Sequence, residues 1–307
     1  MNDYDAIIIG GGPAGLSAGI YLARARQRVV ILDHGTVGGQ VLLTHAVANY
    51  PGLPELSGYQ LASTMRAQAV DFGCDIVSNV AIRKIDLKPG VKTVTTGKES
   101  YTASVVILAM GGSPRTLDLE SETRLQGRGI SYCATCDGDF FTDHDIMVVG
   151  GGNSALEEAV SLTKYAKSVT IVHQFDHFQG YAHAITAAQE NPKIRFMLES
   201  VVEEFIGTDD LSGARIRNLA TGEVTDLAVT GAFVFIGYSP NTKLVSECVV
   251  LNERNEIVAD ESMATSVPGV FVAGDARAKR YRQITTAVGD GTIAALSAMD
   301  YITSAGA

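Results

Sequence analysis

The feature that most constrains this chain is an internal repeat of a glycine-rich turn. Residues 7–34 and residues 147–174 align without a gap, at an offset of 140 residues. Each segment begins with three apolar residues and three glycines, continues with a helical pattern, and ends in a β-branched run. Each therefore predicts a strand, a tight turn, a helix and a second strand, which is the opening of a dinucleotide-binding βαβ unit.

The glycines of the first copy have separate physical roles. Gly10 permits the tight turn, Gly12 lets the backbone approach a pyrophosphate, and Gly15 lets the helix pack closely on the sheet. The first helical turn, with Pro13 and Ala14, then offers free N–H groups to the phosphates. One such motif is a weak signal in a chain with 32 glycines, since a ligand-free turn looks the same. Two superimposable copies are a strong signal.

The residue at the end of the second strand distinguishes the two copies. Asp33 ends the first copy, and a carboxylate there accepts hydrogen bonds from a ribose. The second copy has His173 at the same place and lacks the acid. Two non-equivalent dinucleotide sites in one chain indicate two cofactors in relay, as in flavoprotein disulfide reductases. The residues expected to hold the second nucleotide are Gly150, Gly152, Asn153, Ser154 and Gln174.

A segment near the end of the chain completes the first unit. Residues 270–275 predict a strand that ends in Gly274-Asp275, so the first domain is expected to be discontinuous. Glycine-rich segments at residues 111–114 and 237–240 mark the two places where the chain is expected to pass from one domain to the other. Both segments also suit ordinary loops. The expected fold is α/β, with two doubly wound Rossmann-like domains. The expected bounds are 1–114 and 243–307 for the FAD-binding domain and 115–242 for the central domain.

Composition excludes several other classes of protein. Hydrophobic residues make up 46% and charged residues 19% of the chain, which suits well-packed globular domains. The net charge of −10 argues against a nucleic-acid partner, because binding to phosphates needs a basic surface. No apolar run is long enough to span a membrane. The acidic start of the chain is unlike a signal peptide, so a cytoplasmic location is expected.

Cys133, Cys136 and Asp137 are the residues expected to carry the chemistry. A CxxC pair brings two sulfurs within disulfide reach, and a helix start there favours the reactive thiolate. A carboxyl group at Asp137 can supply or remove the proton that thiol–disulfide exchange needs. The alternative is half of a zinc site, for which His144 is a candidate ligand without supporting spacing. The remaining cysteines, Cys74 and Cys248, are expected to be buried and inert.

The chain resembles the low-molecular-weight thioredoxin reductases over essentially its whole length. The resemblance rests on the glycine turn at 10–15, Gly38-Gly39-Gln40, Asn49 before Tyr50-Pro51-Gly52, the segment 133–138, Gly274-Asp275 and Tyr281-Arg282-Gln283. It implies an FAD-dependent enzyme that forms homodimers and reduces a thioredoxin-like protein.

The resemblance also assigns roles to single residues. It implies that Cys136 faces the flavin, that Cys133 attacks the protein disulfide, and that Asp137 is the acid–base group. Arg128 matches a position that contacts the thioredoxin partner. The remaining positions that the resemblance and the glycine motifs assign to FAD are Gly39, Gln40, Asn49, Ala109, Gly111, Gly274, Asp275, Arg282 and Gln283.

The second nucleotide site departs from the family pattern. Members that use NADPH have arginines where this chain has Gln174, Phe175 and Gln179. Arginine binds a 2′-phosphate through its bidentate fork, and glutamine and phenylalanine cannot replace that charge. NADH is therefore the expected electron donor. Reduced ferredoxin or a deazaflavin is the alternative, and a ferredoxin– or flavodoxin–NAD(P) reductase is a second alternative that needs no CxxC pair.

Two further groups of residues have less specific interpretations. His173, His177 and His183 are expected to be solvated, although a metal cluster is conceivable; no metal site is predicted. The run 277–282 contains the one basic patch of an acidic chain. It suits either a solvated loop or a surface that receives an acidic electron-donor protein, since opposite charges steer encounter.

Overall fold

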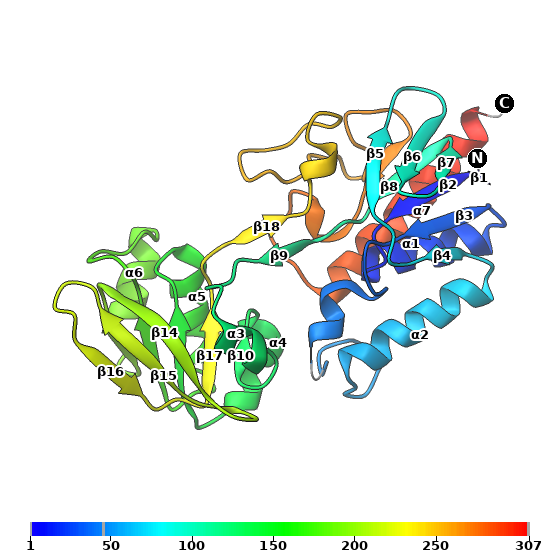
Figure 1. The fold of residues 1–307 in the computed structure, drawn as a ribbon. Coiled ribbons are helices and arrows are strands. Elements are labelled where there is room, and N and C mark those ends of the chain that lie inside the picture. The colour runs from blue at the N-terminus through cyan, green and yellow to red at the C-terminus, as the bar shows by residue number, and fades with distance from the viewer. Residues whose placement is uncertain (1, 45–46, 306–307) are drawn as a thin grey trace. The chain divides into compact units, whose positions relative to one another are not determined.

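The chain folds into two compact units, each built around its own parallel sheet (Figure 1). The structure is a computed structural model and describes residues 2–44 and 47–305. Unit 1 combines residues 1–113 with residues 239–307, and unit 2 contains residues 114–238. Unit 1 is therefore assembled from both ends of the chain. The cofactors assigned to the two domains from the sequence stay predictions.

The parallel sheet of unit 1 has the strand order β19-β8-β2-β3-β4. In that order its strands are Val270–Val272, Val105–Leu108, Ala6–Ile9, Val29–Leu32 and Asp75–Val77. Alternate side chains of β2 enter two different cores, Ile8 on one face and Ile7 and Ile9 on the other. Burial on both faces explains why these strands are continuous apolar runs.

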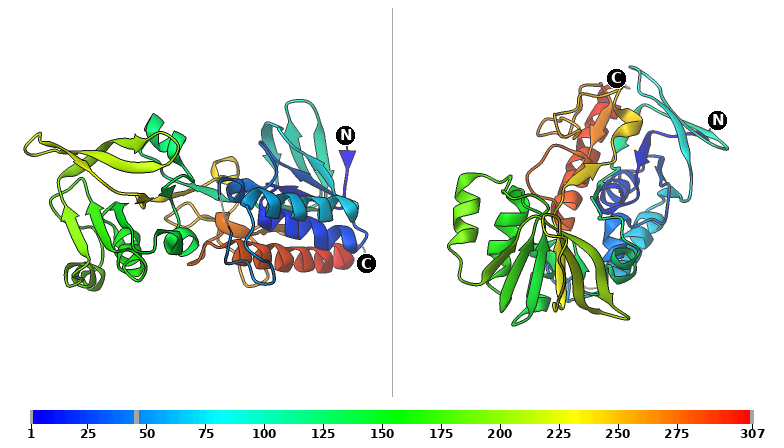
Figure 2. Two further views of the ribbon diagram at one scale, coloured as in Figure 1. Left: turned by 90° about the horizontal axis from the view of Figure 1, so that it is seen from below. Right: turned by 60° about the vertical axis from the view of Figure 1, so that its left-hand side comes forward.

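Different elements cover the two faces of this sheet. One face packs against helices α1 (Pro13–Arg24), α2 (Gly58–Asp71) and α7 (Ile284–Ala305), and α7 runs beside α1 (Figure 2). A second sheet, β1-β7-β6-β5, contributes to the core on the other face. Its strands are Asn2–Asp3, Ser100–Ala103, Lys92–Thr96 and Ile82–Asp86.

Unit 2 repeats this plan. Its parallel sheet has the order β10-β17-β11-β12-β13, and the antiparallel sheet β14-β15-β16 packs against one face. The parallel strands are Ile130–Ser131, Gly231–Val234, Asp145–Val149, Ser168–Val172 and Ile194–Met197, and the antiparallel strands are Ser200–Gly207, Leu211–Asn218 and Val224–Leu227. The helices are α3 (Glu120–Leu125), α4 (Ala134–Asp137), α5 (Asn153–Leu162) and α6 (Ala182–Gln189).

The sequence repeat is also a repeat of strand register. Ile9 of β2 pairs with Leu32 of β3, and Val149 of β11 pairs with Val172 of β12, 140 residues further along. The Rossmann-like α/β fold predicted from the glycine turns is therefore confirmed. The antiparallel sheets on the second faces are an addition that the sequence analysis did not anticipate.

The remaining elements are two short strands and several 3-10 helices. The two crossings between the units, β9 (Gly112–Pro114) and β18 (Tyr238–Pro240), pair as a two-stranded sheet. Short 3-10 helices occur at Gly39–Leu43, Gly138–Phe141, Lys243–Val245 and Gly274–Ala276. Within the described ranges, no helix combines the length and the apolar character needed to cross a membrane.

Gly10 tests how strictly the first turn is constrained. Its φ is +105°, and a Cβ there would collide with the backbone carbonyl of Ala109. We expect Gly10→Ala to lower the free energy of unfolding of unit 1 by roughly 3 kcal/mol or more, from backbone strain and the collision together. The measurement is urea unfolding of the full chain.

The matched control is Gly73→Ala. Gly73 has a φ of +95°, but a Cβ there meets no atom of the described residues within 4 Å. We therefore expect a loss of only about 1 kcal/mol, from strain alone. Equal losses in the two variants would show that the close approach at Gly10 is unimportant.

Candidate functional site

The first glycine turn forms an open cradle at the start of helix α1. A Cβ at Gly15 would collide with the carbonyl of Gly10. A Cβ added at Gly12 would meet only one atom of the described residues within 4 Å, the Cα of Gly39 at 4.0 Å. Helix α1 begins after Gly12 with a proline and has no side-chain cap. The N–H groups of its first turn therefore remain available to an anion, which suits the pyrophosphate of a dinucleotide.

Asp33 lies at the end of β3, beside this cradle. Its buried carboxylate accepts N–H bonds from Gly11 at 2.6 Å and from Gly35 at 2.8 Å. Each carboxylate oxygen has a second lone pair, so the group can still accept a ribose hydroxyl. The structure thus brings Asp33 to the middle of the glycine turn.

The C-terminal segment reaches the same turn. Gly274, which follows β19, has a φ of +77°, and a Cβ there would lie 2.9 Å from the Cβ of Ala14. The next residue, Asp275, pairs through Oδ1 with Lys279 Nζ at 3.0 Å. Residues from both ends of the chain therefore meet at the start of α1.

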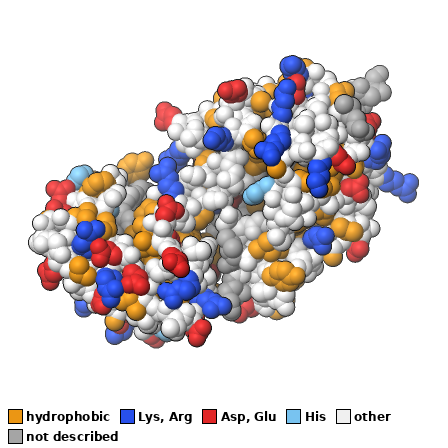
Figure 3. Space-filling view, viewed as in Figure 1, with side chains coloured by type: hydrophobic (Ala, Val, Ile, Leu, Met, Phe, Trp, Pro, Cys, Tyr) orange, Lys and Arg blue, Asp and Glu red, His pale blue; other side chains and the backbone are white. Residues whose placement is uncertain are grey.

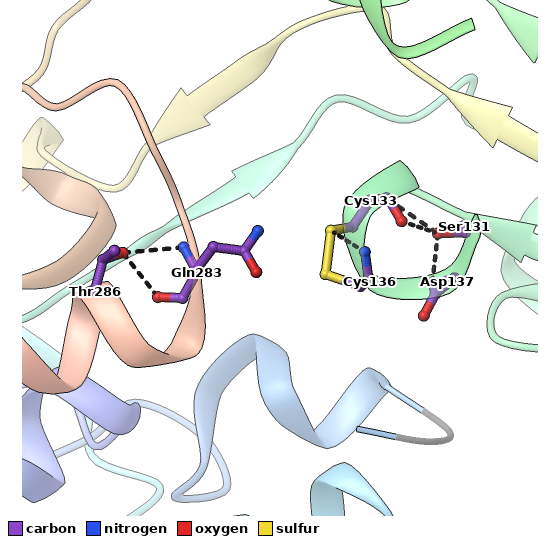
Figure 4. The surroundings of a disulfide bond; sticks show 6 residues. All are labelled: Ser131, Cys133, Cys136, Asp137, Gln283 and Thr286. Carbon is purple, nitrogen blue, oxygen red and sulfur yellow. Dashed lines mark hydrogen bonds between the residues drawn. A yellow bond between two sulfur atoms is a disulfide. The ribbon is translucent and has the colours of Figure 1, made fainter. Parts of the chain in front are cut away.

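The other positions assigned to the flavin also belong to unit 1. Gln40 Nε2 donates to Ser113 Oγ at 3.4 Å, and the backbone N–H of Gln283 donates to Thr286 Oγ1 at 3.1 Å, just before α7 (Figure 4). Asn49 is exposed, and Arg282 pairs with Glu256. The backbone at Ala109 and Gly111 follows β8.

The second glycine turn in unit 2 has similar backbone geometry but a different side chain beside it. Gly150 has a φ of +132°, and helix α5 begins after Gly152 without a side-chain cap. A Cβ at Gly151 would collide with three ring atoms of His173. The imidazole therefore lies against the turn of unit 2, at the position equivalent to that of Asp33 in unit 1.

The expectation that His173 is solvated is wrong. Only 4% of the residue is exposed, its ring stacks on Phe178, and Nε2 lies 3.1 Å from the carbonyl of His177. Burial lowers the pKa of His173, so the ring is neutral at physiological pH. Side chains of His177 and His183 are exposed, at 69% and 72%.

The chain after each second strand returns across its glycine turn. In unit 1 the N–H of Gly38 donates to the carbonyl of Gly11 at 2.8 Å, and in unit 2 the N–H of Gln179 donates to Gly151, also at 2.8 Å. The N–H of Tyr181 then lies 3.4 Å from Asn153 Oδ1. Gln174 and Ser154 are both placed close to this second turn by their sequence positions beside His173 and Asn153.

Cys133 and Cys136 form a disulfide at the carboxyl end of β10 (Figure 4). Cys133 is the N-cap of the short helix α4, and its Sγ accepts the N–H of Cys136 at 3.2 Å. That N–H bond favours a negative charge on Cys133 once the disulfide opens. The pairing also removes the thiolates that a zinc site would need.

Asp137, the last residue of α4, lies beside this pair. Ser131 Oγ donates to its Oδ2 at 2.5 Å (Figure 4). Burial raises the pKa of Asp137, the hydrogen bond from Ser131 opposes this by lowering it, and the nearby Asp139 raises it. A carboxyl group whose pKa is raised toward neutrality suits proton exchange with thiols.

Known proteins share this sequence and fold. The profile of the pyridine nucleotide-disulphide oxidoreductases matches residues 4–291. A thioredoxin reductase from Peptoclostridium acidaminophilum is 43% identical over 308 residues, which is 98% of each chain. A bifunctional thioredoxin reductase/thioredoxin from Mycobacterium leprae is 42% identical over 96% of this chain and 65% of its own length. The crystal structure of thioredoxin reductase from Streptococcus pyogenes has a TM-score of 0.95, at 42% identity over 98% of this chain and 99% of that one.

The chain belongs to the pyridine nucleotide-disulphide oxidoreductase family. Within this family it groups with the low-molecular-weight thioredoxin reductases, as the sequence resemblance predicted. It is an enzyme, an oxidoreductase that acts on a disulfide. Family membership implies a flavin cofactor and a nicotinamide nucleotide as electron donor. The cradle at α1, with its free N–H groups and the carboxylate of Asp33, fits a flavin dinucleotide.

Two residues near the disulfide of this oxidoreductase were missed by the sequence analysis. Glu122 is 1% exposed and accepts bonds from the N–H of Leu117 and from Tyr132 OH, both at 2.8 Å. Burial and the contact with Glu122 raise the pKa of Tyr132. This pair fixes the chain just before Cys133. No motif in the sequence signals it, because the partners come from different elements.

The two cysteines outside the disulfide differ in their burial. Cys74 is buried, as expected, but Cys248 is only partly buried. Burial raises the pKa of both thiols. Among the described residues, no group of three or more His, Cys, Asp or Glu side chains is arranged to hold a metal ion.

The basic run at 277–282 is largely neutralised inside unit 1. Arg277 pairs with Asp290 at 3.1 Å, and Lys279, whose side chain is 7% exposed, pairs with Asp290 at 3.2 Å as well as with Asp275. The idea of a solvated basic loop is therefore wrong for these cations, because acids distant in sequence are folded against them.

Proposed function

We propose that this protein is an FAD-dependent thioredoxin reductase that takes electrons from NADH and works as a homodimer. The observation that supports this most directly is the Cys133–Cys136 disulfide, with Asp137 beside it, in a chain with two dinucleotide turns. Relatives of full length are thioredoxin reductases by name, and one relative is fused to a thioredoxin. Exposed Arg128 is the proposed contact for the thioredoxin partner.

Bound FAD would supply two-electron transfer between the nicotinamide and the disulfide. The residues proposed to hold it are the first glycine turn, Asp33, and the positions assigned above in unit 1. Gly150, Gly152, Asn153, Ser154 and Gln174 are the residues proposed for the nicotinamide nucleotide.

The cysteines then pass the electrons to thioredoxin. The Cys133 thiolate attacks one sulfur of the partner's disulfide, and the other partner sulfur leaves with the bonding electron pair and takes a proton from Asp137. Cys136 thiolate next attacks Cys133, which restores the intramolecular disulfide and releases the second partner sulfur as a thiolate. The N–H of Cys136 that bonds to Cys133 Sγ supports Cys133 as the attacking residue, because it stabilises that thiolate.

Asp33 is the proposed contact for the adenosine ribose of FAD, and its replacement tests that site. Asp33→Asn exchanges an acceptor-only group for an amide whose NH₂ faces one of two backbone N–H donors. We expect at least a tenfold weaker retention of FAD, since charge-assisted bonds contribute about 1.5–3 kcal/mol each. The readout is flavin content, with the released flavin identified by chromatography.

Asp5→Asn is the matched control for that variant. Its carboxylate also accepts a backbone N–H in unit 1, from Arg28 at 2.7 Å, but at the opposite ends of the strands. It should keep its flavin. Recovery of FMN from the wild-type protein, or full FAD retention by Asp33→Asn, would contradict the proposed site.

The two cysteines are expected to behave differently when replaced by serine. Cys133→Ser and Cys136→Ser should each abolish thioredoxin reduction and keep the flavin, because neither can form the disulfide. Cys133→Ser should retain a thiolate–flavin charge-transfer absorption, and Cys136→Ser should lose it. Cys248→Ser, which removes a thiol outside the pair, is the control and should remain active. A reversed spectroscopic pattern would exchange the roles, and turnover in both variants would refute the mechanism.

The choice of NADH rests on the charges after β12. Gln174, Phe175 and Gln179 supply no cation, and the exposed Asp176, paired with His177 at 2.6 Å, adds a negative charge to this loop. A 2′-phosphate placed here would meet a carboxylate instead of arginine forks. NADH has no phosphate at this position, so the absence of arginines does not weaken its binding.

The basic run gives little support to a ferredoxin donor. Its cations at Arg277, Lys279 and Arg282 are paired with acids of the same unit, so they offer little net charge to an acidic protein. On the face shown in Figure 3, basic and acidic side chains are interspersed. Reduced ferredoxin and a deazaflavin are therefore ranked behind NADH.

Arginines restored at the second turn test the donor directly. We expect the wild-type protein to reduce its flavin faster with NADH than with NADPH at equal low concentration. The double variant Gln174→Arg, Phe175→Arg should raise kcat/KM for NADPH about tenfold or more and leave NADH nearly unchanged, because each charge-assisted bond to the phosphate is worth about 1.5–3 kcal/mol.

The control places the same two charges elsewhere on unit 2. Ala187→Arg with Gln189→Arg, at exposed positions near the end of α6, should leave the ratio of the two nucleotides unchanged. Faster wild-type turnover with NADPH would refute the NADH assignment. Flavin reduction by reduced ferredoxin, with neither nucleotide active, would favour the alternative donor.

A further inference from the structure

Ser131 connects three parts of the redox site. It is the last residue of β10, with 6% of its surface exposed. Its Oγ accepts the backbone N–H of Cys133 at 3.0 Å and donates to Asp137 Oδ2 at 2.5 Å (Figure 4). A serine hydroxyl has one proton, so the donation to Asp137 competes with a longer contact, 3.4 Å, to the carbonyl of Cys133. The shorter, charge-assisted bond is the stronger.

The contact acts on the charge state of Asp137. Burial and Asp139 both disfavour the carboxylate, and the hydroxyl of Ser131 favours it. Asp139 lies in the 3-10 helix that follows α4. Tyr165, beside Gly138, is a further titratable side chain near this turn, and the cysteine pair becomes titratable once it is reduced.

We propose that Ser131 is a positioning residue for Asp137: its hydroxyl holds the carboxyl group beside the cysteine turn and stabilises the ionised form. During exchange an S–S bond breaks, and the departing sulfur keeps the bonding electron pair. The proton of Asp137 moves to that sulfur, which leaves a thiol and an Asp137 carboxylate. Ser131 O–H bonds to this carboxylate and so sets the pH range in which Asp137 can give up its proton. The inference rests on the proposed function, because it concerns the acid–base group of that reaction.

The chain contains a matched control for this pair. Ser168 Oγ donates to Asp145 Oδ1 at 2.6 Å, also within unit 2, and Asp145 also pairs with Lys167. The chemistry of the two serine–aspartate contacts is the same, but Asp145 and Ser168 begin strands β11 and β12 instead of following β10. Ser168→Ala therefore removes an equivalent hydrogen bond away from the cysteines.

The first readout follows Asp137 itself and needs neither donor nor partner. The carboxyl carbons of aspartate are ¹³C-labelled in the full-length, flavin-loaded protein, and the Asp137 signal is assigned by its loss in Asp137→Asn. We expect Ser131→Ala to raise the pH midpoint of Asp137 by about one unit, from the loss of one bond to a charged acceptor. Ser131→Thr retains a hydroxyl and should stay near the wild type, as should Ser168→Ala.

The second readout is the pH profile of thioredoxin reduction. Asp137 gives up a proton only while it is protonated, so the rate falls as pH rises through its pKa. A raised pKa therefore moves the alkaline limb of kcat upward in Ser131→Ala, by the same interval as the carboxyl titration. Ser131→Thr should restore the wild-type limb, and KM for thioredoxin should not change. Folding is checked by circular dichroism, and Ser131→Gly serves as a second hydroxyl-free variant.

The outcomes separate the two hypotheses. An Asp137 midpoint that does not move in the hydroxyl-free variants overturns the inference. A midpoint that moves without a shift of the alkaline limb also overturns it, because the contact would then not govern the reaction. A wild-type enzyme that fails to reduce thioredoxin refutes the proposed function instead, and the carboxyl titration still decides whether Ser131 controls Asp137.

Discussion

The close approach of backbone to backbone at the glycine turns is the constraint on which both units depend. In unit 1 the Cα of Gly15 lies against the carbonyl of Gly10, and Gly10 lies against the carbonyl of Ala109, which follows the neighbouring strand β8. In unit 2, Gly150 lies in the same way against the carbonyl of Phe235. These contacts bring the end of one strand, the start of a helix and the end of the next strand together. Polar backbone groups are thereby concentrated at the carboxyl ends of the sheet, where ligands of α/β proteins bind.

The same geometry explains where the redox pair lies. β19 in unit 1 and β10 in unit 2 are edge strands at corresponding places in the two strand orders, each separated by one strand from the strand that leads into the glycine turn. β19 leads into Gly274-Asp275, and β10 leads into Cys133. The disulfide in unit 2 therefore occupies the position in its strand order that the turn proposed to bind FAD has in unit 1. The two units therefore have equivalent edge strands that are followed by different residues, Gly274-Asp275 after β19 and Cys133 after β10.

Sequence patterns predict secondary structure within a short segment, but they do not predict contacts between side chains that are distant in the sequence. The repeat at 7–34 and 147–174 predicted the strands, turns and helices because each signal lies within one short segment. The antiparallel strands were not predicted, because a strand such as Ile82–Asp86 mixes exposed and buried residues without a clear period. The pairing of Lys279 with Asp290 and of Tyr132 with Glu122 also has no local signal. Ser131 was overlooked for this reason, although Cys133 and Asp137 beside it were not.

His173 shows how one substitution changes what a retained turn can recognise. In unit 1 a carboxylate bonds to the middle glycine of the turn, and in unit 2 a neutral ring fills the corresponding space. The start of α5 has no side-chain cap, so in the proposed nucleotide site it would attract a pyrophosphate, which NADH and NADPH share. The proposed discrimination between the two nucleotides therefore depends on the loop that follows, where the only formal charge between Gln174 and Gln179, with histidine neutral, is that of Asp176. Under the proposed assignment to NADH, the site selects by repelling the extra phosphate of NADPH, and it gains no carboxylate for the ribose in exchange. Such selection lowers the affinity for one nucleotide without raising it for the other.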